Sequence, residues 1–174
     1  MRPLDPRLLK QFVRRAADTV EGDWVVIGGT VLPLLGAGDR ATLDIDLIPV
    51  GEASQSDILD LMEIAEQMGL PVEAVNQAGA YFLKKIPDFE DHLILLLEGS
   101  SARIFRPDPT LFIRMKAHRL SESDLEDCLA ILRFARASGE EFDETELRGS
   151  VRTELEKQIG IGRRERLESL LSAI

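Results

Sequence analysis

The sequence predicts an α+β fold, a small mixed β-sheet flanked by helices, with a C-terminal helical extension. Two observations point to it. In the N-terminal part, short apolar runs bounded by turn residues are typical of buried strands. From Pro107 onward the apolar residues recur at helical spacing instead. Because strands come first and helices last, we expect an α/β core over residues 1–106, with a helical part, residues 107–174, packed on it.

Length and composition limit the kind of protein. A chain of 174 residues with 44% hydrophobic residues is typical of one globular domain with a few extra helices, and excludes general disorder. No apolar run approaches the roughly 18 residues of a membrane span, and the N-terminus has no secretory core. The single cysteine permits no internal disulfide. We therefore expect a cytoplasmic protein with no membrane partner, and the formal charge of −10 argues against a general nucleic-acid-binding surface.

The first half of the chain supplies the strands. Asp5-Pro6 is a good helix start, and an apolar stripe continues that helix until Gly22. We expect a strand at 24–27, a short helix from Thr30, a strand at 43–49, a helix at 56–68, and a hairpin formed by 92–97 and 103–106. Residues 71–86 fit helical spacing, although 81–86 also fit a short strand, and we expect a helix there.

The second half supplies helices with clear start signals. Asp108, Ser121 and Asp143 are the predicted N-caps, and Gly139 is a predicted stop. The predicted core face of the helix after Ser121 comprises Leu125, Leu129, Leu132 and Phe134. Gly160 and Gly162 separate the third helix from a last one over 163–173.

Two carboxylates interrupt the second apolar run. Side chains alternate across a strand, so Asp44 and Asp46 share one face, opposite Leu43, Ile45 and Leu47. Neighbouring carboxylates on such a strand repel one another and lose water. A divalent cation removes most of that cost, and Mg²⁺, or Mn²⁺ in its place, is a hard ion suited to carboxylates and substrate phosphates. The alternative is a carboxylate pair at a sheet edge facing water.

A glycine pair precedes these carboxylates. Gly28 and Gly29 close the first strand, and Thr30 follows them. Glycines allow close backbone approach, and amides at the start of a helix can bind phosphate oxygens. The sequence therefore predicts a nucleotide phosphate site here, with a tight turn as the alternative. Thr30 offers a hydroxyl for the phosphate, or a helix cap.

The order and spacing of these two motifs resemble the signature of the nucleotidyltransferase superfamily, which has the polymerase-β-like fold. The extended pattern R-x-T-x-D-x-D, from Arg40 through Thr42 to Asp46, is similar to AbiEii-type toxins and DUF6036-type proteins. The resemblance covers roughly residues 25–132. It implies a nucleotidyltransferase-like sheet and a nucleotide-binding role for this segment. Arg40 and Thr42 then order the loop before the second strand, or Arg40 reaches a phosphate.

A second group of residues lies in the helical part. Lys116 is followed by Asp124 and Asp127, which are three residues apart and share one helix face. The resemblance implies that Lys116 binds phosphate beside the D-x-D pair, while Asp124 or Asp127 pairs with it or positions the acceptor. The residues alone also allow a solvated Lys116, a capping-box Asp124, and Asp127 as a surface partner of Arg119.

Many members of the resembled fold carry a third metal-binding carboxylate on a later central strand. Here the apolar run 93–97 has none, and only Asp91 and Glu98 flank it. Asp91 is the first candidate and Glu98 the second. If neither reaches the metal, the site holds one ion weakly, or the chain is a degenerate binding module.

These residues lead to one functional hypothesis and two alternatives. The resemblance implies transfer of a nucleoside monophosphate from Mg-NTP to a hydroxyl of an unidentified protein, RNA or small molecule. It also suggests a toxin–antitoxin component with a cognate toxin or antitoxin partner. One alternative is a non-catalytic member that binds nucleotide or a partner protein. The other is an interaction protein whose acidic surface engages a basic partner.

Overall fold

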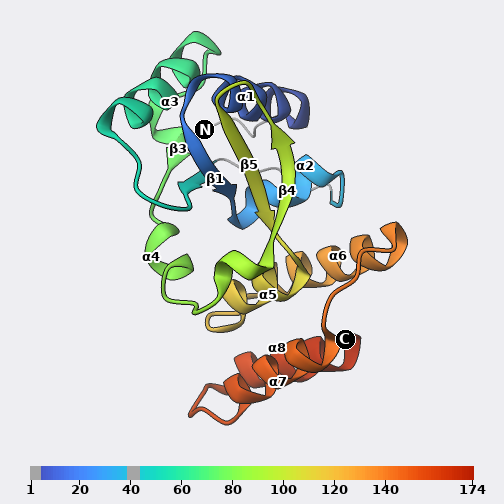
Figure 1. The fold of residues 1–174 in the computed structure, drawn as a ribbon. Helices are drawn as coiled ribbons and strands as arrows, with labels where there is room; N and C mark the ends of the chain where they lie inside the picture. Colours follow the sequence, from blue (N-terminus) through green and yellow to red (C-terminus); the bar gives the residue numbers. More distant parts are fainter. Residues whose placement is uncertain (1–4, 39–43) are drawn as a thin grey trace. The chain divides into compact units, whose positions relative to one another are not determined.

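A five-stranded mixed sheet with strand order β3-β2-β1-β5-β4 forms the N-terminal part of the computed structural model (Figure 1). The structure describes residues 5–38 and 44–174. The chain divides into two compact units, Met1–Pro107 and Asp108–Ile174, and each is described by itself. The α+β class predicted from the sequence is confirmed. No helix in the described part of the chain is both long and apolar enough to span a membrane.

The sheet is built around a buried central strand. Its strands are β1 (Gly22–Val26), β2 (Ile45–Pro49), β3 (Val75–Asn76), β4 (Leu93–Glu98) and β5 (Ala102–Pro107). β1 pairs antiparallel with β2 and parallel with β5. Its residues Trp24, Val25 and Val26 alternate between the two faces and are all almost fully buried, so both faces of the sheet are covered at this strand. The expected hairpin is confirmed as the antiparallel pair β4 and β5.

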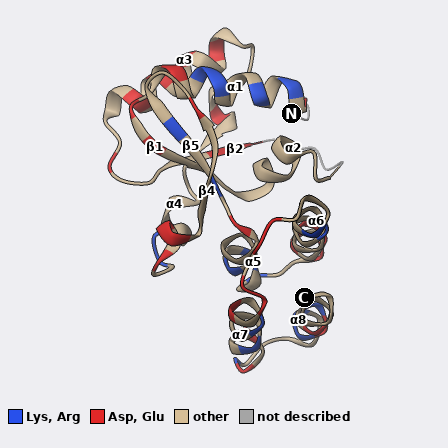
Figure 2. Cartoon of the chain, turned by 45° about the vertical axis from the view of Figure 1, so that its right-hand side comes forward, with Lys and Arg blue, Asp and Glu red and all other residues tan. Residues whose placement is uncertain are grey.

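Helices of the first unit flank this sheet. They are α1 (Pro6–Thr19), α2 (Val31–Leu35), α3 (Gln55–Gln67) and α4 (Ala80–Leu83), with 3₁₀ turns η1 (Gly28–Thr30), η2 (Val72–Ala74) and η3 (Phe89–His92). Asp5 caps α1 as expected, because its carboxylate accepts from the Arg7 amide. α1 packs against β5, α2 and α3. Figure 2 shows basic residues along α1 and acidic residues along α3.

The helix expected over residues 71–86 is wrong for most of that segment. The chain instead forms η2, then β3, and only Ala80–Leu83 is α-helical. Val75 and Asn76 pair in parallel with Ile45 and Asp46 of β2. The open edge of β2 offers backbone hydrogen bonds that the local helical pattern does not reveal, so tertiary pairing overrides it.

The second unit consists of helices. They are α5 (Pro109–Ala117), α6 (Glu122–Ser138), α7 (Glu144–Leu155) and α8 (Ile161–Ala173). Asp108, Ser121 and Asp143 are the N-caps that the sequence predicts. Gly139 ends α6 in the left-handed conformation, with φ +71°. The last helix begins at Ile161, two residues before the expected start.

The predicted core face of α6 needs correction. Of the expected residues, Leu132 is buried, but Leu125, Leu129 and Phe134 are only half-buried. The most buried residues of this helix are Asp124, Asp127, Cys128, Ile131, Leu132 and Ala135. Burial raises the pKa of the Cys128 thiol to about 12. The apolar pattern did not indicate this face because it includes two aspartates.

Candidate functional site

The glycine turn directly faces the D-x-D strand. After β1, the Ile27 amide donates to the Asp46 carbonyl at 2.9 Å, and Gly28 follows with φ +65°. A Cβ built on Gly28 would collide with Oδ2 of Asp46. Glycine is therefore required here for two reasons, the left-handed backbone and the close approach of the carboxylate. Gly28 and Asp46 form one structural feature.

Thr30 ties the same turn to the backbone of the D-x-D segment. Its side chain is fully buried, and its hydroxyl donates to the Asp44 carbonyl at 3.0 Å. The same hydroxyl accepts from the Asp46 amide at 3.2 Å. The helix-cap alternative is wrong, because the structure shows no side-chain capping bond from Thr30. Thr30 acts on the site by holding the strand on both sides of Ile45.

The two carboxylates lie at the start of β2. Asp44 immediately precedes the strand and Asp46 is its second residue. Both are half-buried, whereas Ile45 and Leu47 are fully buried, as the alternation predicts. Oxygen ligands on one face of a rigid strand suit a hard divalent cation. Arg40 and Thr42, the other expected residues of this segment, lie outside the described residues.

The candidates for a third carboxylate lie elsewhere in the sheet. Asp91 is in η3, directly before β4, and Glu98 ends β4. β1 and β5 separate β4 from β2. At one strand spacing of about 4.8 Å, three spacings place these strands about 14 Å apart. Within residues 5–38 and 44–174, no three His, Cys, Asp or Glu side chains gather closely enough to hold a metal. We therefore leave Asp91 and Glu98 out of the candidate site.

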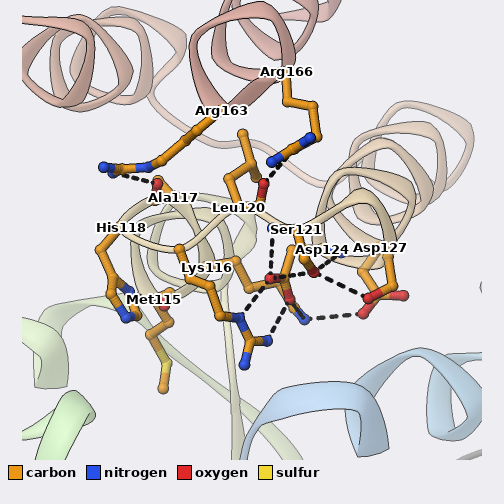
Figure 3. Close-up of polar contacts among 12 residues, drawn as sticks. Met115, Lys116, Ala117, His118, Leu120, Ser121, Asp124, Asp127, Arg163 and Arg166 are labelled. Atoms are coloured by element: carbon orange, nitrogen blue, oxygen red, sulfur yellow. Dashed lines mark hydrogen bonds and ion pairs between the residues drawn. The ribbon is translucent and has the colours of Figure 1, made fainter. Parts of the chain in front are cut away.

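A buried ion cluster occupies the corner between α5 and α6 (Figure 3). The Lys116 ammonium donates to Oδ1 of Asp124 at 3.1 Å and to Oδ2 of Asp127 at 2.9 Å. The two aspartate side chains are 1% and 2% exposed, and the lysine side chain is 11% exposed. The solvated Lys116 allowed by the sequence is therefore wrong, and so is a surface position for Asp127.

Asp124 is held from several sides. Arg119 donates from Nε and Nη2 to its two carboxylate oxygens, both at 2.8 Å. Ser121 donates its hydroxyl to Asp124 at 2.7 Å. The expected capping box is also present, because each of these side chains accepts from the backbone amide of the other residue. Burial alone raises the pKa of Asp124, but the hydrogen bonds from Arg119 and Ser121 and the Lys116 charge hold that pKa well below its usual range. Asp124 is therefore a stable carboxylate anion.

Sequence reasoning missed the supports that α8 gives to this corner. Arg163 donates to the Ala117 carbonyl at 2.9 Å, and Arg166 donates to the Leu120 carbonyl at 2.6 Å. Leu120 is fully buried with φ +37°, an unusual conformation for a branched residue. The sequence carries no signal for these bonds beyond the arginines themselves. Both arginines fix the backbone between Lys116 and Asp124.

The structure thus brings the predicted residues together as two groups. Asp44 and Asp46 lie with Gly28, Gly29 and Thr30 in the first unit, and Lys116 lies with Asp124 and Asp127 in the second. The ammonium of Lys116 has three N–H donors, of which the two aspartates take two.

A glycine turn against a D-x-D strand on a small mixed sheet defines a nucleotidyltransferase-like α+β protein. The comparison with known families agrees. A family model described as "Nucleotidyltransferase of unknown function (DUF6036)" matches residues 7–143, and the chain belongs to this family. The matched region contains both groups of residues and ends before α7. No curated protein and no solved structure matches the chain.

Proposed function

We propose that this protein binds a nucleoside triphosphate with Mg²⁺ or Mn²⁺ at Asp44 and Asp46 and transfers a nucleoside monophosphate to an acceptor hydroxyl. In such a reaction the hydroxyl oxygen bonds to the α-phosphorus, the bond from that phosphorus to the bridging oxygen breaks, and pyrophosphate leaves. A bound divalent cation supplies the charge that neutralises the phosphates. Asp44 and Asp46 hold that cation, and the turn at Gly28 and Gly29 gives the phosphates access to backbone amides.

The observation that carries the proposal is the contact between Gly28 and the Asp46 carboxylate. A side chain at residue 28 would fill the space that the Asp46 oxygen occupies. Thr30 adds a second tie, since its hydroxyl bonds to the backbone of both Asp44 and Asp46. A phosphate-binding turn and a metal-binding strand held in fixed register are what positioned phosphoryl chemistry requires.

Lys116, Asp124 and Asp127 form the second part of the proposal. Their resemblance to the family pattern supports a phosphate-binding role for Lys116, whose ammonium gives two of its three N–H donors to aspartates within residues 5–38 and 44–174. Asp124 and Asp127 orient the ammonium through their two hydrogen bonds. A role for Asp124 or Asp127 toward the acceptor rests on the resemblance alone.

Pyrophosphate release tests the proposed reaction. The purified protein is incubated with ATP, CTP, GTP or UTP, Mg²⁺ or Mn²⁺, and cellular protein, RNA or small-molecule fractions as acceptors. We expect metal-dependent pyrophosphate release with one of these fractions and transfer of the labelled α-phosphate to it. The Asp44→Asn, Asp46→Asn double variant should release none, whereas Glu66→Gln with Glu73→Gln, which removes two exposed charges from the same unit, should match the wild type.

Nucleotide binding without product would favour the non-catalytic alternative, and absence of both would overturn the proposal.

A toxin–antitoxin role is the biological context that the resemblance supports, together with a cognate partner protein. Expression in cells tests it. We expect growth arrest by the wild type but not by the Asp44→Asn, Asp46→Asn variant.

A further inference from the structure

Strand β3 brings Asn76 beside the D-x-D pair. Asn76 is the register partner of Asp46 on the neighbouring parallel strand. Paired residues of adjacent strands project from the same face of a sheet, about 4.8 Å apart along the hydrogen-bonding direction. On its other side, Oδ2 of Asp46 lies where a Cβ of residue 28 would be. Asp46 therefore lies between the glycine turn on one side and β3 on the other, and Asn76 shares its face of the sheet.

The orientation of this carboxamide is set by its own turn. Oδ1 of Asn76 accepts a hydrogen bond from the Ala78 amide at 2.8 Å. An asparagine that accepts from the backbone two residues later forms an Asx turn. Because the oxygen is engaged by the chain, the amide nitrogen is the end that can donate to a ligand. The segment is also fixed to the sheet, since a Cβ on Gly79 would collide with the Ile27 side chain.

The next residue carries an unusual buried donor. Nε2 of Gln77 is buried and has no hydrogen-bond partner within the described residues. Buried polar atoms are nearly always paired, so each exception needs an explanation. A ligand that brings acceptor oxygens to this turn would give Nε2 of Gln77 a hydrogen-bond partner.

We propose that Asn76 is a substrate-binding residue that donates from its amide nitrogen to a phosphate oxygen of the nucleotide. This inference rests on the proposed function, because the nucleotide held at Asp46 is the ligand. A neutral carboxamide next to Asp46 attracts phosphate oxygens, whereas a carboxylate at the same place repels them. The site thereby keeps two carboxylates for the cation and adds a donor for the triphosphate.

The decisive variant is Asn76→Asp. Aspartate has nearly the same shape and also accepts in an Asx turn, but it replaces the NH₂ donor by a charged oxygen. The two readouts should then move in opposite directions. Calorimetry with Mn²⁺ alone should show binding about tenfold tighter, because a third carboxylate joins the pair. Calorimetry with ATP, CTP, GTP or UTP at saturating Mn²⁺ should show binding about tenfold weaker for the nucleotide that the wild type prefers.

Two further variants separate the loss of the NH₂ donor from the added negative charge. Asn76→Ala removes the donor without adding charge, so it should weaken nucleotide binding and leave Mn²⁺ binding unchanged. Gln11→Glu adds the same charge on the exposed face of α1 and should change neither affinity. Circular dichroism and thermal unfolding confirm that each variant is folded.

The outcomes distinguish this inference from the proposed function. If the wild type binds nucleotide, the Asp44→Asn, Asp46→Asn variant does not, and Asn76→Asp matches the wild type in both titrations, Asn76 serves only its turn and the inference is overturned. If the wild type binds none of the four nucleotides with Mn²⁺, the proposed function fails and the inference fails with it. Opposite shifts of the two affinities support both the role of Asn76 and the proposed function.

Discussion

At the residue scale, Lys116 neutralises two buried carboxylates. Removing it leaves Asp124 and Asp127 buried with less positive charge. Breaking a buried ion pair by truncating one partner costs roughly 3–5 kcal/mol. We expect Lys116→Ala to lower the free energy of unfolding by about 3 kcal/mol in a urea titration.

Arg119→Ala is the matched control, because it removes the same charge from the same cluster. The Arg119 side chain is 69% exposed, and Asp124 keeps its bonds to Ser121 and Lys116. We expect a loss of about 1 kcal/mol, typical of exposed pairs. Losses below about 0.5 kcal/mol for both variants would contradict the buried-cluster account.

The lowered pKa of Asp124 predicts how the free energy of unfolding depends on pH. Its pKa in the folded protein is well below the value of about 3.9 expected in the unfolded chain. The unfolded state therefore binds the proton more readily, so the stabilisation is present above about pH 4 and is lost as pH falls toward the folded pKa. Urea titrations between about pH 5 and pH 2 should show a smaller pH-dependent loss in Asp124→Asn than in the wild type. Identical slopes would show that Asp124 contributes nothing.

At the element scale, the turn after β1 depends on glycine for two separable reasons. Gly28 and Gly36 both have positive φ, +65° and +68°, but only Gly28 has the Asp46 carboxylate in the position of a Cβ. Alanine at either position should cost about 1 kcal/mol of stability through backbone strain. Only Gly28→Ala should also weaken nucleotide binding in Mn²⁺, because it displaces Asp46. Equal binding by both variants would show that this contact does not matter to the site.

Local signals in the sequence were sufficient to predict the helix caps, the β4–β5 hairpin and the alternation of buried residues around Asp44 and Asp46. Each of these depends on residues close together in the chain, as at Ser121 and Asp124. The rest depends on distant partners. Thr30 bonds to the backbone of Asp44 and Asp46 at the start of the next strand, and Asn76 comes beside Asp46 only through strand pairing. The buried face of α6 was missed because its aspartates are neutralised by a lysine from α5.

At the scale of the whole molecule, α7 and α8 lie beyond the region that the family model matches. Arginines of α8 nevertheless bond to the backbone between Lys116 and Asp124. The match ends at residue 143, whereas Arg166 of α8 donates to the Leu120 carbonyl. We expect Arg166→Ala to cost about 1–3 kcal/mol, since the buried carbonyl of Leu120 loses its charged donor. Arg164→Ala, on the exposed side of the same helix, should cost under about 0.5 kcal/mol in the same urea titration. Equal losses of stability in the two variants would show that the Arg166 bond does not stabilise the ion cluster.

The central claim is that Asp44 and Asp46 hold the cation of a bound nucleotide. A calorimetric titration of Mn²⁺ with each nucleoside triphosphate, on the wild type and on the Asp44→Asn, Asp46→Asn variant, tests it most directly. The account predicts metal-dependent binding by the wild type, loss of that binding in the variant, and an unchanged circular dichroism spectrum. Nucleotide binding of equal affinity in a folded variant would contradict it.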